Sequence, residues 1–361
     1  MQQQTFLDST PAVDPAPIDA NAPAQTAPDW ALLRATLPFR RAFPGRSLWQ
    51  VASTLLLFVA CCTLVALHPA WWMKLLLVLP LAGLLVRVFV LQHDCGHGSL
   101  FNSPRANSIV GHLLACITTV PFRLWAAEHH WHHNNQGKLE HRGVDLMNSP
   151  LTLDEAAADE PGRRYRENKI TPFNIFCIGA WSLLVERKFT RDFFLFRKAF
   201  RWPVPNERKL RRSIWFAHAG SIAAHGTLLF ALGWVHYLSF IVPASFLAAG
   251  CGSLLFWVQH NFEDTYFDRL SDWRFDKVGT QGSSYLKLPQ PLRWFTADIG
   301  LHHVHHLNAH IPNYRLEEAR RALPVLAAVR PLTRDQLRAT FYKLFWDVKR
   351  RKMAAWPGLP H

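Results

Sequence analysis

Cysteine is scarce in this chain, which has six in 361 residues. No two of them have the spacing of an iron–sulfur or haem-attachment motif, and no paired framework of disulfides is indicated. The sequence therefore excludes a redox cofactor held by its own cysteine motifs. Any electrons that the protein uses must come from another molecule.

Acidic residues are also few, 26 against 40 Lys and Arg, which gives a formal net charge of +14. Nucleic-acid binding is not expected, because positive charge beside apolar segments is ordinary in membrane proteins. Between Arg187 and Arg212 there are ten Lys or Arg and two acids. By the positive-inside tendency this segment is predicted to lie in the cytoplasm.

Charge is almost absent from four long apolar segments, at about 48–67, 71–91, 214–235 and 237–258. Each approaches the roughly 20 residues that cross a bilayer as a helix. Three residues join the first pair and His236 joins the second, so each pair is predicted to form a hairpin. We therefore expect an all-α integral membrane protein with four transmembrane helices and a helical cytoplasmic domain.

The remaining segments suggest a domain organisation. Lys and Arg are missing before Arg34, and a shorter apolar stretch at 109–122 and another at 173–185 are predicted to be interfacial or re-entrant. Residues 332–352 have apolar side chains at helical spacing. The predicted divisions are a disordered tail at 1–33, a membrane domain at 34–314 with cytoplasmic parts at 92–212 and 259–314, and a helical cytoplasmic tail at 315–361.

Ten of the 19 histidines fall in three clusters, at 93–97, 129–133 and 302–306. Residues three and four apart share one face of a helix, so each cluster can present two or three imidazoles to one metal site. The eight candidates are His93, His97, His129, His132, His133, His302, His305 and His306. His130 and His303 point about 100° away and are expected to bond neighbouring groups or face solvent.

Eight imidazoles exceed what one tetrahedral ion can use, which favours two metal ions. Imidazole binds Fe, Cu, Zn and Ni alike, so the ligand type does not choose the metal. Because both hairpins return to their starting side, the three clusters share a compartment. His260 is a ninth candidate, since it follows the fourth apolar segment as His93 follows the second.

A histidine-rich membrane protein can also be a metal transporter. Transport sites lie near the bilayer midplane on broken helices. Here the clusters lie beyond the apolar segments and all on one side, which disfavours transport.

The motifs at 93–99 (HDCGHGS), 258–266 (VQHNFEDTY) and 301–308 (LHHVHHLN) resemble the membrane fatty acid desaturases with three histidine boxes. The resemblance runs from Val90 to Tyr314 and is nearest the bacterial acyl-lipid type, delta-12/omega-6-like. It implies a diiron centre whose ligands are the eight candidates with His260. The doubled histidines leave His130 and His303 as alternatives, but the family spacing favours His129 and His302.

The resemblance also implies a reaction, in which O2 and two irons remove two hydrogens from an acyl chain to leave a double bond and water. The substrate is a membrane lipid or an acyl thioester, and no separate acid or base residue is assigned. A ferredoxin or small haem protein with its reductase supplies electrons. The implied location is the bacterial inner membrane with a cytoplasmic active site, and a lipid hydroxylase, ketolase or epoxidase is the alternative.

Overall fold

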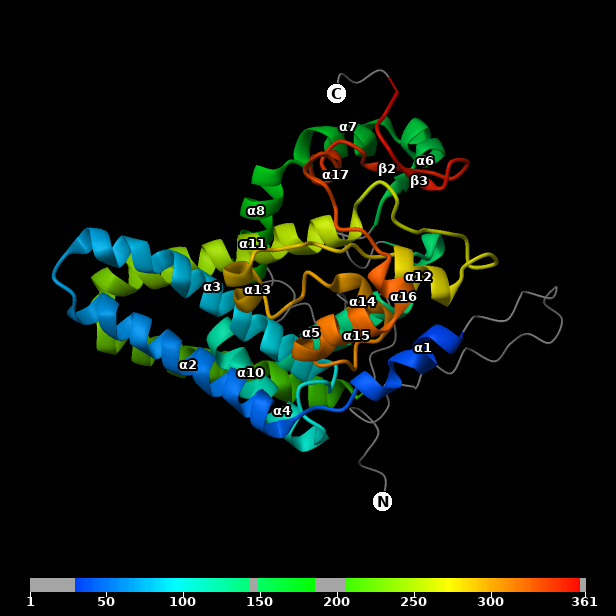
Figure 1. The fold of residues 1–361 in the computed structure, drawn as a ribbon. Helices are drawn as coiled ribbons and strands as arrows, with labels where there is room; N and C mark the ends of the chain where they lie inside the picture. Colours follow the sequence, from blue (N-terminus) through cyan, green and yellow to red (C-terminus); the bar gives the residue numbers. More distant parts are fainter. Residues whose placement is uncertain (1–29, 143–148, 186–205, 358–361) are drawn as a thin grey trace.

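The computed structural model describes residues 30–142, 149–185 and 206–357, and helices dominate these parts of the chain (Figure 1). The predicted all-α architecture is confirmed, apart from one small sheet. The basic segment that was predicted to be cytoplasmic lies outside the described residues from 187 to 205.

The first predicted hairpin consists of α2 (Pro44–Leu67) and α3 (Trp71–Gly96). Both helices are long and apolar enough to cross a membrane. Pro44 occupies the first turn of α2, where its missing N–H costs no helical hydrogen bond. Helix α3 continues beyond the apolar segment and carries His93 in its last turn.

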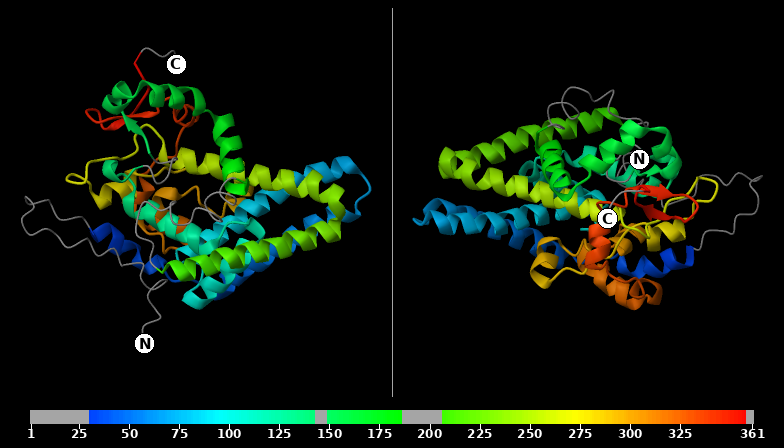
Figure 2. Two further views of the ribbon diagram at one scale, coloured as in Figure 1. Left: turned by 180° about the vertical axis from the view of Figure 1, so that it is seen from behind. Right: turned by 90° about the horizontal axis from the view of Figure 1, so that it is seen from above.

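The second predicted hairpin is a continuous helical run of 54 residues. It comprises α10 (Glu207–His236), the π-helical segment η5 (Tyr237–Ile241) and α11 (Val242–His260). Gly233 leaves the helical conformation with φ 76°. The chain turns back on itself between α10 and α11, as the green ribbons of Figure 2 show. Among the described residues, three helical stretches are long and apolar enough to cross a membrane, and the third holds both predicted helices. Four separate crossings remain a prediction.

The turns of the two hairpins lie at one end of the molecule, opposite the domain of short helices (Figure 1). A hydrogen bond of 2.6 Å joins Lys74 Nζ to His236 Nε2 between these turns. His236 Nδ1 donates to the Leu232 carbonyl, so its Nε2 is free to accept from the ammonium. The contact fixes the two hairpins against each other.

A bent helix pair lies between the hairpins in the sequence. Helix α4 (Pro104–Thr118) ends where Thr119 adopts a left-handed φ of 60°, and α5 (Phe122–Asn135) leaves at 102° to it. This geometry fits a broken span or a re-entrant segment. Helix α8 (Pro172–Trp181) is the second short apolar helix, and its interfacial position stays a prediction.

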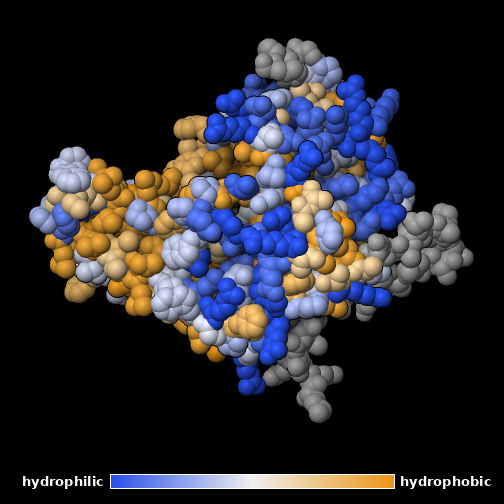
Figure 3. Space-filling view, in the orientation of Figure 1, coloured by the Kyte–Doolittle hydropathy of each residue, from blue (hydrophilic) through white to orange (hydrophobic). Residues whose placement is uncertain are grey.

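Apolar side chains cover the surface of the hairpins, while the opposite part is hydrophilic (Figure 3). Phe230 is 92% exposed and Ile222 is 76% exposed, both on α10. Exposed apolar surface of this extent is rare on proteins surrounded by water. These faces contact lipid, and the chain is a membrane protein.

Short helices and turns form the polar end of the molecule. They are α6 (Leu153–Ala158), α7 (Glu160–Lys169), α12 (Phe275–Gln281), α13 (Gln290–Phe295), α14 (His302–Leu307), α15 (Leu316–Ala322), α16 (Pro324–Ala327), η2 (Leu139–His141) and η6 (Asn313–Arg315). The core around α14 contains Val304 and Leu307 from this helix with Leu316 and Ala319 from α15. All six residues of α14 are buried, so the third histidine cluster is enclosed.

The predicted disordered tail is wrong for its last four residues, because α1 spans Trp30–Thr36 and η1 follows at Leu37–Phe39. The Trp30 ring stacks on Phe275 at 5.0 Å, and Leu32 packs on the core around α14. Residues 1–29 lie outside the described residues. Tertiary contacts thus order a segment whose composition suggested disorder.

The predicted helix over 332–352 is also wrong beyond Ala339. Helix α17 (Arg334–Ala339) is followed by β2 (Phe345–Asp347) and β3 (Lys352–Ala354), which pair antiparallel, and β1 (Leu151–Thr152) pairs parallel with β2. Phe345 and Trp346 bury opposite faces of β2 in different clusters. A short apolar run buried on both faces cannot be told from a helix by its periodicity.

Trp346 is 1% exposed between Phe267 and Met353, and we expect Trp346→Ala to destabilise the protein by about 3–5 kcal/mol. Val348, which is 42% exposed, provides the control, because Val348→Ala should change stability by less than about 0.5 kcal/mol. Thermal unfolding in detergent measures both. Equal melting temperatures for the two variants would contradict the burial of β2.

Candidate metal centre

The nine predicted histidines come together at the polar ends of four helices. His93 and His97 end α3, and His260 is the last residue of α11. The second cluster lies on α5, and the third lies on α14. Segments that are more than 200 residues apart in sequence therefore supply one site.

Five imidazoles form a first group. His93, His97, His129, His133 and His305 each offer one ligand nitrogen, and these atoms lie within 4.8 Å of one another. His133 Nε2 is 3.1 Å from both His129 Nε2 and His305 Nε2. All three sequence clusters contribute to this group.

A second group contains His132, His260 and His306, whose ligand atoms also lie within 4.8 Å of one another. His302 borders it, since its Nε2 is 3.0 Å from His260 Nε2 and 3.1 Å from His306 Nε2. The rings of His133 and His306 stack at 4.0 Å, so the two groups are adjacent.

The donor set fits metal binding. The Nε2 atoms of His93 and His97 are buried and have no hydrogen-bond partner among the described residues. Buried polar atoms are normally paired, and a bound cation satisfies such lone pairs. Convergent imidazole nitrogens are the ligands that transition metals accept. The histidine groups can hold metal ions.

The protonation of the third cluster suits this role. Burial, and then the neighbouring imidazoles, lowers the pKa of His302, His305 and His306 well below the ordinary value. The three rings are therefore neutral at pH 7. A neutral imidazole keeps one nitrogen lone pair for a metal ion.

Hydrogen bonds orient His93 within the first group. Its Nδ1–H donates to Asp94 Oδ1 at 3.1 Å, which directs the lone pair of Nε2 into the centre. Asp94 Oδ2 in turn accepts from the Asn313 backbone N–H at 2.9 Å and from its side-chain amide at 2.8 Å. Asn313 is 219 residues away and carries no sequence signal, so sequence reasoning missed it.

Other neighbours orient His260 and His97. His260 hydrogen-bonds the backbone of Gly282, and the Gln136 side-chain amide lies 2.9 Å from its Nδ1. His310 hydrogen-bonds the backbone of His97. Gln136 directly follows α5, and only the fold reveals its contact with a residue 124 positions away.

His130 and His303 lie outside both groups, as their predicted direction required. His130 hydrogen-bonds the backbone of Gly96. His303 is fully buried beside Tyr285, at 5.5 Å between ring centres, and burial lowers its pKa to about 4. Of the two expected roles, burial leaves His303 the contact with neighbouring groups and excludes exposure to solvent.

A large cavity of about 1610 Å³ meets the histidine groups, and His93, His129, His132 and His302 form part of its wall. Trp125 and Phe256 line it as well. The Trp125 ring stacks on His129 at 4.5 Å, and Phe256 lies 5.0 Å from His132. These aromatic rings shield the centre from water.

The cavity follows α11 from Val242 to Gln259, a length of about 26 Å at helical rise. Its far part reaches His225 and Tyr237. The Tyr237 hydroxyl donates to His225 Nδ1 at 2.8 Å, and His225 Nε2–H donates to the Ile117 carbonyl at 3.0 Å. A long, mostly apolar channel thus connects the histidine centre with the membrane-embedded end.

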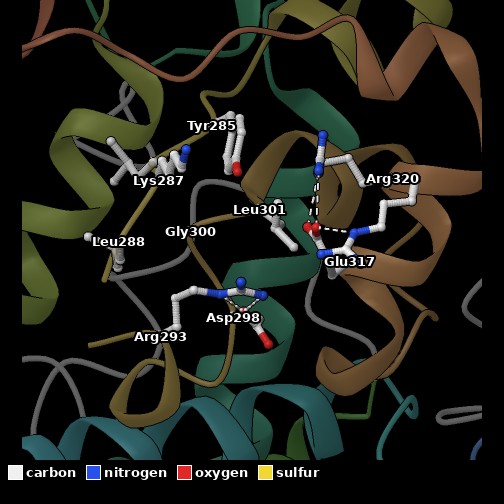
Figure 4. Close-up of a pocket in the computed structure, with 11 residues that line it drawn as sticks. Tyr285, Lys287, Leu288, Arg293, Asp298, Gly300, Leu301, Glu317 and Arg320 are labelled. Carbon is white, nitrogen blue, oxygen red and sulfur yellow. Dashed lines mark hydrogen bonds and ion pairs between the residues drawn. The ribbon is translucent and has the colours of Figure 1, made fainter. Parts of the chain in front are cut away.

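A smaller, separate pocket of about 280 Å³ is lined by residues from the ranges 285–301 and 317–321 (Figure 4). Arg293 pairs with Asp298 at 2.6 Å, and Glu317 pairs with Arg320 and Arg321. Lys287 also lines the pocket. Its wall includes Leu301, which directly precedes His302, so this basic pocket backs onto the metal centre.

Residues 69–336 match the family model described as "Fatty acid desaturase". The chain belongs to the fatty acid desaturase family. It is similar to the "Fatty acid desaturase" of Bacillus subtilis, with 30% identity over 91% of each chain. The family resemblance of the histidine boxes is confirmed, and this membrane enzyme is a fatty acid desaturase.

Two further relatives have more specific names. The "sn-1 acyl-lipid omega-3 desaturase (ferredoxin)" of Synechocystis is 26% identical over 72% of this chain and 70% of its own. The "sn-2 acyl-lipid omega-3 desaturase (ferredoxin), chloroplastic" of Arabidopsis thaliana is 30% identical over 66% of this desaturase and 52% of its own length.

We expect His305→Ala to lower the amount of metal that copurifies with this desaturase, because His305 joins the first histidine group. His68→Ala is the control, since His68 lies in the turn of the first hairpin. Elemental analysis of both purified variants measures the difference. Equal metal content in the two would rule out a metal-binding role for His305.

Proposed function

We propose that this desaturase uses two iron ions and O2 to introduce a double bond into an acyl chain of a membrane lipid. The observation that supports this proposal most is the meeting of two adjacent histidine groups with one long apolar cavity. A hydrophobic channel accepts an acyl chain from the bilayer, and the histidine groups border its wall.

The first ion is assigned to His93, His97, His129, His133 and His305. The second is assigned to His132, His260, His302 and His306. When bound, the irons and O2 supply the oxidising power that removes hydrogen from an unactivated methylene pair.

The protein's own residues position the chain and protect the site. Trp125 and Phe256 hold the acyl chain beside the histidines and exclude water, which preserves the oxidant for the lipid. Asp94 keeps the proton of His93 on Nδ1. No residue is assigned as a separate acid or base.

We assign electron supply to a ferredoxin with its reductase, and a small haem protein is the alternative donor. Two relatives are named for ferredoxin, and this sequence has no iron–sulfur or haem-attachment spacing of its own. The pocket behind His302 has four basic and two acidic side chains. Positive charge at this place attracts an acidic donor.

We also propose a bacterial inner membrane location with the metal centre on the cytoplasmic face. The excess of Lys and Arg between residues 187 and 212 supports this orientation. Oxidation near the methyl side of the chain is proposed from the resemblance and from the omega-3 names of two relatives. A hydroxylase, ketolase or epoxidase uses similar chemistry, but family membership favours desaturation.

Expression in a desaturase-deficient host tests the reaction. The wild-type protein should produce new double bonds, which mass spectrometry locates, while His132→Ala and His305→Ala should abolish them. His68→Ala should retain the wild-type product. Label from ¹⁸O2 in the lipid without a new double bond would contradict desaturation and indicate a hydroxylase.

Charge reversal tests the donor site. We expect Lys287→Glu with Arg321→Glu to raise the KM for ferredoxin by about tenfold with little change in the KM for lipid, because charge pairs at an interface govern association. Arg338→Glu, in an exposed pair with Asp335, is the matched control. An unchanged KM for ferredoxin would place donor binding elsewhere.

A further inference from the structure

One end of the large cavity is basic. Arg166 and Lys169 line it together with Tyr165 and Asn174, from α7 and the start of α8. Asp159, the N-cap residue of α7, also lines the cavity and accepts a hydrogen bond from the Gly162 N–H, which leaves two basic groups to one acidic group here. The same cavity is lined by His93, His129 and His132. We call the end of the cavity at Arg166 and Lys169 the basic lip. A single ligand can therefore contact this basic lip and extend toward the histidine centre.

The arginines of α7 differ in their pairing. Arg163 pairs with Glu167 at 3.2 Å, and Arg164 pairs with Glu160 at 2.6 Å. In contrast, Arg166 and Lys169 form no ion pair with a carboxylate among the described residues. The two basic residues of α7 that line the cavity, Arg166 and Lys169, are thus the ones that no carboxylate pairs with.

Arg166 is held in place by its own hydrogen bond. Its Nη2 donates to the Ser149 carbonyl at 2.6 Å, and the remaining N–H groups of the guanidinium can still bind an anion. Burial, and then the charge of Arg142, lowers the pKa of Arg166. A bound anion would offset both effects.

The position of the basic lip matches the membrane interface. Lys169 ends α7, and α8 begins three residues later. The apolar side chains of Phe173, near the start of α8, and of Trp181, at its end, are exposed. Tyr165 is exposed beside Arg166. Basic and aromatic residues next to an apolar helix lie at the level of lipid headgroups.

We propose, on the basis of the proposed function, that Arg166 and Lys169 bind the phosphate of an anionic glycerophospholipid whose acyl chain enters the cavity. The substrate is then a complete phospholipid in the membrane. An acyl-CoA carries phosphate too, but it approaches from water, whereas this lip adjoins α8 with its exposed apolar side chains. At about 1610 Å³ the cavity exceeds the roughly 300–1,000 Å³ of ordinary small-molecule pockets, as a bulky lipid requires.

Steady-state kinetics with the iron-loaded full-length desaturase and its donor tests the site. One set of vesicles contains phosphatidylglycerol, and a second contains a neutral glucosyl diacylglycerol with the same acyl chains. For the double variant Arg166→Gln, Lys169→Gln we expect the KM for phosphatidylglycerol to rise about tenfold or more, since hydrogen bonds to charged groups are lost. Its kcat and its KM for the glucolipid should match the wild type.

Two controls accompany this variant. Arg164→Gln changes an arginine of the same helix outside the cavity and should leave both KM values unchanged. Arg166→Lys with Lys169→Arg keeps both charges and should restore most of the affinity for phosphatidylglycerol.

Three results would overturn the inference. They are an unchanged KM for phosphatidylglycerol, an equal loss on both lipids, which indicates a purely structural role for α7, and a wild-type preference for acyl-CoA over phosphatidylglycerol. Failure of the proposed function looks different, because the wild-type protein would then form no double bond in any of the three substrates.

Discussion

The structure depends on the convergence of nine imidazoles in one place. Nitrogen lone pairs such as those of His93 and His97 are costly in a dry interior unless a cation satisfies them. The fold meets this requirement by bringing together the last turns of α3, α5 and α11 with the buried helix α14. Metal ions bound by these histidines would therefore couple metal binding to the assembly of the polar domain.

The membrane supplies the second constraint. The apolar faces of α2 and α10 lie in lipid, and the hairpin turns lie at the far end, joined by the bond between Lys74 and His236. This arrangement places the histidine centre at the ends of the membrane helices. A hydrophobic substrate can then travel along α11 within the protein, and polar partners can approach from the opposite side.

Basic side chains lie in two separate pockets near the histidine centre. The lip at Arg166 and Lys169 belongs to the large cavity, while the pocket around Arg293 and Asp298 is lined by Leu301, the residue before His302. The first fits an anionic headgroup and the second an acidic electron donor. In the two proposals, lipid and electrons thus reach the histidines from different pockets.

The sequence by itself determined the apolar segments, the hairpins and the nine candidate histidines, because hydropathy and helical spacing are local properties. It predicted no strand at Phe345–Asp347, since a short run buried on both faces has no distinctive period. Only the tertiary structure decided that His305 joins the group of His93 while His306 joins that of His260. It also brought Asn313 and Gln136 to the centre, because contacts across such distances in the chain depend on how the helices pack.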